Sequence, residues 1–415
     1  MIKKILIMLI SLNVCLFAEG GSNYSAFGIG DIESVQGAAY MGLGGASVAV
    51  PSQYHINMTN PAMWSHLSLT RIQLGYKFQQ SYVTSSSNNI FQNNGSIDGI
   101  NALFMIDTSR GISLGFGLNN YTNVSYSIAS GFSKIIDNLP VSGKLENVGT
   151  GGMKKIYIGA SYKPFSFLSF GINHNVYLGT IQRDATTLSN ESYAHDSFTG
   201  RKYAFSGSNQ RLGLNLHFGD LMLGGFYETS AKIENRSSLI YISYYNLISS
   251  NSTIVDTSFN STNYFEIPST IGFGASYLID KFRIAADFTS QDFSNFNFNK
   301  GDNNKFQALN TFSFGIERLG NTSAGADVLD KWTYRFGLGY KDLYLNIDNK
   351  PINEMYLSLG LSAPFGKTSI FDYAIVFGSR GQVSSPLVQE YFTRMYFNVS
   401  IGEQWFVPFK REFGD

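Results

Sequence analysis

The sequence predicts an all-β protein: an up-and-down antiparallel transmembrane β-barrel of about 14 strands, with an N-terminal hatch that plugs the lumen. Segments in which apolar and polar residues alternate recur along the whole chain, and short connections alternate with long ones. The polar positions are rich in Gly, Ser and Asn instead of Lys and Glu. Alternation indicates strands with one apolar and one polar face. Short turns on one side and long loops on the other are typical of membrane barrels.

The chain begins with the pattern of a secretory signal peptide. Lys3 and Lys4 precede an apolar run that ends at Ala18, after which we expect cleavage, so residues 1–18 are the expected signal peptide. The single cysteine, Cys15, lies inside this segment. We therefore expect the mature protein to contain no disulfide and no cysteine-bound metal.

Composition excludes several functional classes. Charged residues make up 14% of the chain and aromatic residues 15%, and the 30 basic residues equal the 30 acidic ones. A chain without net positive charge is not expected to bind nucleic acid. After the signal peptide no apolar run is long enough for a membrane helix. We expect a hatch at 19–66, one barrel at 67–406 and a short C-terminal tail at 407–415.

The alternating segments place the strands of the barrel. The clearest is Ile271–Tyr277, in which Ile271, Phe273, Ala275 and Tyr277 share one face. A soluble sandwich or propeller is the alternative, but it would expose more Lys and Glu on its polar faces. We expect fourteen strands, near 69–82, 96–107, 111–127, 153–163, 167–180, 203–218, 221–236, 263–279, 281–293, 306–319, 331–345, 352–363, 369–379 and 388–404.

Between the signal peptide and the first strand, about 50 residues do not alternate. They are rich in glycine but also contain Phe27, Ile29, Tyr40 and Leu43, which a disordered tail would rarely carry. Irregular backbone at membrane depth is tolerated only inside protein or against water, so a plug within the lumen is expected. The segment ends with a helix start, where Asn60 caps and Pro61 occupies the first helical position.

The motif Asn60-Pro61-Ala62, placed just before the first strand, resembles the Asn-Pro-Ala motif that ends the hatch in the FadL family of outer-membrane transporters for hydrophobic compounds. The segment 266–277 is similar to that family's Pro-x-x-x-x-x-Gly strand. The resemblance implies an apolar pocket that takes ligand from outside, hatch gating by Asn60, Pro61 and Ala62, and a lateral exit at a kink in the third strand.

The third predicted strand contains a polar interruption that suits such an exit. Asn119, Asn120 and Asn123 break its lipid-facing pattern and are our candidates for the lateral opening. A β-bulge at the same place explains the pattern equally well.

Inward-facing basic residues suggest how a carboxylate would be held. Alternation points Arg71 and Lys77 of the first strand and Arg394 of the last strand into the lumen, and these strands are neighbours in a closed barrel. We predict that the three form one ligand-binding basic patch, with Arg335 as an outlying member. The alternative is that they pair with carboxylates such as Asp31, Glu33 or Asp287.

The longest predicted loop contains the apolar stretch 239–248, either a capture surface for ligand or an extension of its flanking strands. The five histidines form no recognised catalytic motif. His217 is expected to point inward and His174 toward lipid, which indicates an error in the expected strand register there. We expect no enzyme activity, no cofactor and no metal.

Together these observations predict a monomer in the bacterial outer membrane that takes up hydrophobic compounds, long-chain fatty acids or hydrocarbons, by passive diffusion. Its expected partners are the hydrophobic or amphipathic ligand and outer-membrane lipid. Two alternatives stay open: a non-transporting outer-membrane adaptor of a protein secretion system, and a barrel lipase or acyltransferase.

Overall fold

A computed structural model describes residues 21–33, 36–85, 89–136, 138–191, 193–245, 252–298, 305–323, 325–384 and 387–405. The expected signal peptide at 1–18 and tail at 407–415 lie outside this part of the chain.

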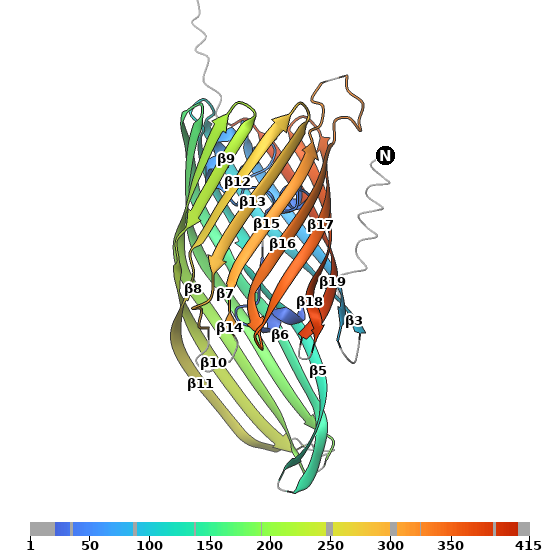
Figure 1. The fold of residues 1–415 in the computed structure, drawn as a ribbon. Helices are drawn as coiled ribbons and strands as arrows, with labels where there is room; N and C mark the ends of the chain where they lie inside the picture. The colour runs from blue at the N-terminus through green and yellow to red at the C-terminus, as the bar shows by residue number, and fades with distance from the viewer. Residues whose placement is uncertain are drawn as a thin grey trace, which may run out of the picture.

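The wall is one closed antiparallel sheet (Figure 1). Successive strands of the wall pair with one another around the barrel, and β19 pairs with β2 to close it. Its strands are β2 (Thr70–Thr84), β3 (Asn89–Asp107), β4 (Ile112–Asn120), β5 (Thr122–Ile136), β6 (Leu139–Phe165), β7 (Leu168–Ser189), β8 (His195–Phe218), β9 (Leu221–Glu228), β10 (Ala231–Tyr245), β11 (Ser252–Ile267), β12 (Thr270–Ile279), β13 (Phe282–Asp292), β14 (Lys305–Phe306), β15 (Ala308–Arg318), β16 (Thr333–Ile347), β17 (Lys350–Phe365), β18 (Ser369–Ser384) and β19 (Leu387–Glu403).

Four pairs of consecutive strands are each one wall strand with a short interruption. They are β4 with β5, β9 with β10, β11 with β12, and β14 with β15, separated by one or two residues. The described residues therefore form fourteen wall strands, which confirms the predicted barrel and its strand number.

Several strands are longer than alternation predicted. Residues 128–152, 181–202 and 237–262, which we expected to be mostly loops, belong largely to β5–β6, β7–β8 and β10–β11. The prediction failed because these stretches have polar residues on both faces, and a ladder of backbone hydrogen bonds needs no apolar face. Of the apolar stretch 239–248, residues 239–245 continue β10 and the rest lies outside the described residues.

Six strands continue past the rest of the barrel and form what we call the extension: the distal parts of β5, β6, β7, β8, β10 and β11. In Figure 1 they run below the other strands. At one margin β5 pairs with β6 and, for two residues only, with an N-terminal strand. At the other margin β11 pairs with β10 alone among the described residues. The extension is therefore an open sheet with two edges.

The opposite half of the barrel, which ends in short turns, has an apolar outer surface. We call it the belt half. Large hydrophobic side chains point outward around its circumference, as a surface in contact with lipid requires. Examples with 37–64% exposure are Leu74, Phe116, Ile158, Phe170, Leu214, Phe273, Phe314, Phe336, Leu357 and Phe371. Among the described helices, none has the length and apolar character needed to cross a membrane.

The N-terminal segment, residues 21–67, packs inside the barrel. It contains η2 (Asn23–Ala26), β1 (Asp31–Ile32), α2 (Gly37–Met41) and η3 (Pro61–His66). Helix α2 contacts β17, β18 and β19, whereas η3 contacts β6, β7 and β8, so the segment crosses the lumen. Its backbone comes very close to the wall at Gly44, where a Cβ would lie 2.5 Å from the Phe314 carbonyl oxygen.

The end of this segment has the predicted local structure. Asn60 is the N-cap of η3, its Oδ1 accepts a hydrogen bond from the Ala62 N–H at 3.1 Å, and Pro61 is the first helical residue. Asn60 Nδ2 also donates to the Leu214 carbonyl of β8 at 3.0 Å. The motif therefore joins the segment to the wall, and its gating role stays a prediction.

Candidate functional site

The wall is interrupted at Tyr121, between β4 and β5. The β3–β4 ladder covers Gly99 to Asp107 of β3, and residues 89–98 of β3 have no partner in β5 among the described residues. The Tyr121 N–H donates to the Met153 carbonyl of β6 at 2.8 Å, so β6 follows both β4 and β5 while β3 does not. The edges of β3 and β5 therefore separate at this point, which we call the wall break.

Glycines of β6 make the break possible. Gly152 has φ +143°, and a Cβ there would lie 2.2 Å from the Thr122 carbonyl oxygen. A side chain at this position would collide with the backbone of β5, so the change in direction requires glycine.

The three predicted asparagines lie at the break. Asn120 Nδ2 donates to the Ile97 carbonyl of β3 at 2.7 Å and so satisfies an acceptor near the point where the β3–β4 ladder ends. Asn119 points inward and exchanges two 3.0 Å hydrogen bonds with Asn101. Asn123 pairs with Asp31 of β1. Their role in a lateral exit stays a prediction.

Residues 21–32 bridge the two edges of the break. On the β5 side, the Gly21 N–H donates to the Ser125 carbonyl at 2.8 Å, and the Ser125 N–H donates to Ser25 Oγ at 3.1 Å. On the β3 side, Gln92 Nε2 donates to Asn23 Oδ1 at 3.0 Å. The N-terminal segment therefore completes the wall where the strands do not.

The interior beside the break is filled by a cluster of buried apolar residues, which we call the aromatic cluster. The segment between β13 and β14 contributes Phe293, Phe296 and Phe298. The N-terminal segment contributes Tyr24 and Ile29. The wall contributes Tyr121, Val124, Tyr126, Met153, Tyr177, Ile181, Tyr203, Phe205, Ala231, Ile233, Phe265, Ile267, Leu309, Leu343, Tyr344, Leu345, Ile347, Ile352 and Leu387.

The rings of this cluster are in direct contact. Phe293 lies 4.9 Å from Tyr344, and Phe296 lies 5.6 Å from Phe265 in an edge-to-face arrangement, between ring centroids. Sequence reasoning placed a connection at 294–305, as the structure has it, but missed the cluster because it took this connection to be polar and exposed. The one available signal was the spacing of Phe293, Phe296 and Phe298, unusually apolar for an exposed connection.

Next to the cluster lies a layer of buried charges around a cavity of about 40 Å³. Arg380 contacts Asp31 at 2.7 Å and Glu354 at 2.6 Å, and Arg394 contacts Glu354 at 2.7 Å. Asp31 of β1, which pairs with Asn123 at the break, is thus also held by Arg380 of β18.

Glu33, which directly follows β1, is likewise paired with a basic side chain of the wall. Glu33 forms an ion pair with Lys77 of β2. Burial alone would raise the pKa of Glu33, but Lys77, together with Arg394 and Lys341, outweighs this effect and holds the pKa below its usual value. Both residues line the 40 Å³ cavity together with Arg394.

The structure does not bring the predicted basic residues into one patch. Lys77 and Arg394 share the small cavity, but Arg71 lies six residues before Lys77, roughly 20 Å along the strand. There Arg71 is 1% exposed, donates to the Thr368 carbonyl at 3.1 Å and lies over the Tyr54 ring. The prediction failed because alternation shows whether a side chain points into the lumen but not where it lies along the barrel axis.

Arg335 lies near the short turns, as Arg71 does, and Asp287 has a different kind of partner. Arg335 contacts Glu317 at 2.9 Å. Asp287 accepts hydrogen bonds from the N–H groups of Ser47 and Val48 at 2.5 and 2.7 Å. Lys77, Arg335 and Arg394 thus contact carboxylates, as the alternative interpretation expected, and their ligand-binding role stays a prediction.

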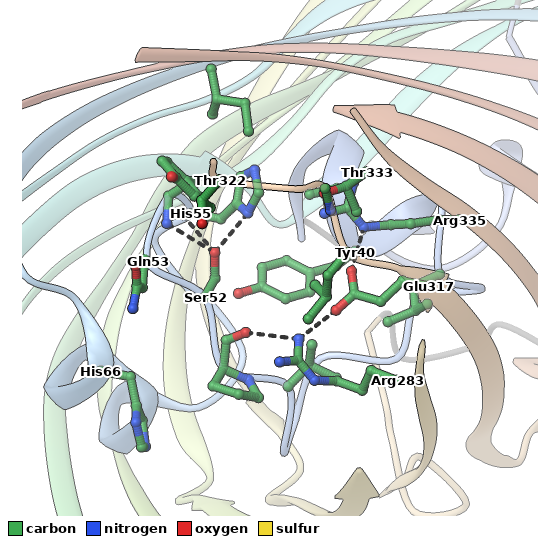
Figure 2. A pocket seen from close by; sticks show the side chains of 18 residues that line it. Tyr40, Ser52, Gln53, His55, His66, Arg283, Glu317, Thr322, Thr333 and Arg335 are labelled. Carbon is green, nitrogen blue, oxygen red and sulfur yellow. Dashed lines mark hydrogen bonds and ion pairs between the residues drawn. The ribbon is translucent and has the colours of Figure 1, made fainter. Parts of the chain in front are cut away.

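Two further cavities border the N-terminal segment. One of about 140 Å³ lies behind the wall break, lined among others by Asn119, Asn120 and Tyr121. The other, of about 320 Å³, lies near the short turns between the N-terminal segment and the 319–333 connection. In Figure 2 the ion pair of Arg335 with Glu317 borders this second cavity.

A chain of hydrogen bonds in the larger cavity has the residue types of a hydrolase triad. Ser52 Oγ lies 2.8 Å from His55 Nδ1, and His55 Nε2 lies 2.9 Å from Asp372 Oδ1 of β18 (Figure 2 shows the first contact). Ser52 Oγ also accepts from the backbone N–H groups of Tyr54 and His55, both at 3.0 Å. This is the pattern of a serine turn, so we interpret the chain as a structural link between segment and wall.

The remaining histidines support the assumed strand register. His217 faces the lumen and its ring lies 5.9 Å from that of His66, while His174 is exposed on the outer face. The suspected register error is therefore absent. Burial lowers the pKa of His66 to about 4, with a smaller contribution from His217. Within the described ranges, no cluster of His, Cys, Asp or Glu could hold a metal ion.

Comparison by sequence gives one family. The family model described as BamG matches residues 1–413. The FadL resemblance is thus supported at the level of fold and not by a sequence family. No curated protein matches the chain.

Solved structures share the fold at low sequence identity. The CymD monoaromatic hydrocarbon channel is 15% identical, with a TM-score of 0.61 over 90% of this chain and 100% of that chain. The toluene transporter TodX of Pseudomonas putida is 15% identical, with a TM-score of 0.60 over 91% and 100%. A FadL homologue of Pseudomonas aeruginosa is 12% identical, with a TM-score of 0.58 over 89% and 98%.

Proposed function

We propose that this chain, which belongs to the BamG family, is a bacterial outer-membrane channel through which hydrophobic compounds leave the lumen sideways, through the wall break. The observation that carries the proposal is the position of the aromatic cluster directly beside a gap in a closed barrel. An apolar compound gains from contact with such side chains, and the gap would connect them to the membrane once residues 21–32 move aside. The shared fold with channels described as carrying monoaromatic hydrocarbons supports this assignment.

Transport requires movement of the N-terminal segment. Residues 21–32 bridge both edges of the break, and Tyr24 and Ile29 are part of the aromatic cluster. Displacement of residues 21–32 would therefore open the gap and loosen the cluster in one step. Asn60, Pro61 and Ala62 would anchor the remainder of the segment while its first part moves.

The ligand class follows from the charges. Lys77 and Arg394 already contact Glu33 and Glu354, so a fatty acid carboxylate must compete with two buried acids. An uncharged hydrocarbon meets no such competition. We therefore propose aromatic or aliphatic hydrocarbons in preference to long-chain fatty acids, and propose no catalytic activity.

A reversible disulfide that holds the N-terminal segment in place tests the proposed lateral route. The double variant S25C/S125C should form a disulfide that ties the N-terminal segment to the β5 edge of the break, where Ser25 Oγ and the Ser125 carbonyl are 3.2 Å apart. Uptake of labelled toluene into vesicles containing the oxidised protein should fall at least tenfold and return after reduction. The matched control is S113C/S161C, whose hydroxyls are 2.8 Å apart within the β4–β6 ladder.

The control pair stiffens the wall without touching the break, so its uptake should not depend on oxidation. If the oxidised S25C/S125C protein takes up toluene as fast as the reduced protein, the lateral route is wrong. If neither state carries toluene faster than protein-free vesicles, transport itself is excluded.

A second candidate function, a non-transporting outer-membrane adaptor, is favoured by the filling of the lumen. The N-terminal segment is hydrogen-bonded to both sides of the wall break, and residues 37–50 are almost all buried. An adaptor would show no uptake in the vesicle assay and would purify with another protein in fixed stoichiometry. A channel would show uptake in the absence of any partner.

A further inference from the structure

The cavity of about 140 Å³ behind the wall break has more basic than acidic residues in its lining. Lys155 of β6, Arg211 of β8 and Lys341 of β16 border it. The carboxylates among the lining residues are those of Glu33 and Glu228. The cavity therefore brings together three cations and two carboxylates.

Both carboxylates of this lining are already neutralised by other groups. Glu33 forms an ion pair with Lys77, which belongs to the neighbouring charged layer. Glu228 Oε2 accepts a hydrogen bond from Arg211 Nε at 2.6 Å. Glu228 Oε1 accepts from the Tyr177 hydroxyl at 2.5 Å. Neither carboxylate therefore depends on a lysine of the cavity for its counter-charge.

The two lysines of the cavity lack a hydrogen-bonded carboxylate within the described part of the chain. Lys155 Nζ lies 3.6 Å from Glu228 Oε1, which is longer than a hydrogen bond, and its side chain is 16% exposed. Lys341 Nζ donates to the Ile32 carbonyl at 2.9 Å. An ammonium group carries three donors, and a charge inside a protein is costly unless it is paired. The lining is therefore complementary to an anion.

The size and the aromatic residues of the cavity restrict which anion fits. A cavity of roughly 150 Å³ can hold one benzene molecule, so the volume of about 140 Å³ suits a single ring. Tyr121 and Tyr157 contribute aromatic rings to the lining. Lys155 Nζ lies 5.8 Å from the centroid of the Tyr121 ring. A charged group and a ring of one small molecule can therefore be contacted together.

We infer that this cavity is a binding site for a single-ring aromatic carboxylate. Lys155 binds the carboxylate, Lys341 adds positive charge, and the ring packs against Tyr121 and Tyr157. A long aliphatic chain exceeds the volume. The site differs from the charged layer, in which Lys77 and Arg394 already contact carboxylates. The inference concerns binding and holds whether or not the channel conducts.

Isothermal titration calorimetry of the purified protein in lipid nanodiscs tests the site, with benzoate as the probe. Benzoate should bind at one molecule per chain. Toluene has the ring without the charge, and acetate has the charge without the ring. Benzoate should therefore bind at least about tenfold more tightly than either compound, because a charge-assisted hydrogen bond and a buried ring each contribute more than this factor requires.

Variants of two adjacent lysines assign the binding to the cavity. K155Q removes the charge that faces the cavity and should weaken benzoate binding by about tenfold or more, without weakening that of toluene. K155R keeps the charge and should retain most of the affinity. K154Q is the matched control, because Lys154 is exposed on the outer face, and it should bind benzoate like the wild type. Heat-modifiable gel mobility shows whether each variant is folded.

Four results would overturn the inference. One is the absence of saturable benzoate binding to the wild type, which is decisive even if K155Q does not fold. Another is an equal benzoate affinity of K155Q and K154Q. Acetate that binds as tightly as benzoate would show that the ring is not recognised. Laurate that binds as tightly as benzoate would show that the cavity does not select a single ring. None of these results depends on the vesicle assay of toluene uptake.

Discussion

The belt half and the extension place their apolar residues on opposite sides of the same strands. Along β7, Phe170 and Ile172 are each 46% exposed on the outer surface, whereas Tyr177 and Ile181 are 1% and 0% exposed inside. In the belt half the lumen holds paired charges and lipid would cover the outside. Toward the extension the aromatic cluster fills the inside, with Tyr177 and Ile181 among its members. One strand thus satisfies two different surroundings.

This difference between the belt half and the extension shows that two kinds of interaction stabilise the fold. Burial of apolar area stabilises the extension as it does a soluble domain. In the belt half the interior depends on carboxylates shared between several cations, where removal of one member leaves charges buried without partners. The predictions below separate these contributions.

The largest expected effect is in the charged layer. E354Q leaves Arg380 and Arg394 without their shared carboxylate, so the free energy of unfolding should fall by on the order of 3–5 kcal/mol. Urea unfolding in lipid vesicles measures it. E146Q, which removes an exposed pair with Lys144, is the control and should change stability by less than about 1 kcal/mol. Equal effects would mean that the lumen charges are solvated.

In the aromatic cluster, F293A removes a ring that is 0% exposed and should cost about 3 kcal/mol. Because the cluster blocks the interior beside the break, uptake of labelled toluene should also rise. F259A, at a ring that is 61% exposed, should change neither quantity. Lower stability without faster uptake would show that the cluster is not the barrier.

The His66 site predicts a pH dependence. Its folded pKa of about 4 lies below the ordinary value of 6.5, so the unfolded chain binds more protons between these values. Stability should therefore fall as pH decreases from 6.5 to 4, by about 3 kcal/mol, and stay constant above. H66Q should flatten this slope in urea unfolding, and H174Q, on the outer face, should not. A wild-type profile that is flat from pH 4 to 6.5 contradicts the prediction.

The smallest expected effect is at the wall break. N120A leaves the Ile97 carbonyl without its 2.7 Å hydrogen bond and should cost about 1 kcal/mol. Faster lateral exit should accompany this loss, measured as toluene efflux from loaded vesicles. N353A removes a hydrogen bond to Tyr340 far from the break and should leave efflux unchanged. Efflux equal to wild type in N120A would show that Asn120 does not limit opening.

Sequence reasoning succeeded where one surface is apolar. The segment Ile271–Tyr277 was placed correctly because lipid-facing and lumen-facing positions differ in chemistry. Asn119 and Asn120 were found because polar residues interrupted that contrast. Sequence reasoning failed to predict how far apart Arg71 and Lys77 lie along the barrel axis, because a two-residue period carries no information on that position. The extension and the Phe293 segment were missed because their contacts join residues distant in sequence.

The β19–β2 ladder closes the barrel by joining residues more than 300 positions apart, such as Tyr82 and Tyr391. Contacts between such distant residues are entropically costly to form and are expected late. The segment that fills the lumen directly precedes β2, so we expect it to be enclosed as this seam forms. The order of assembly is therefore built into the topology: the content of the barrel is synthesised first, and the wall is sealed around it last.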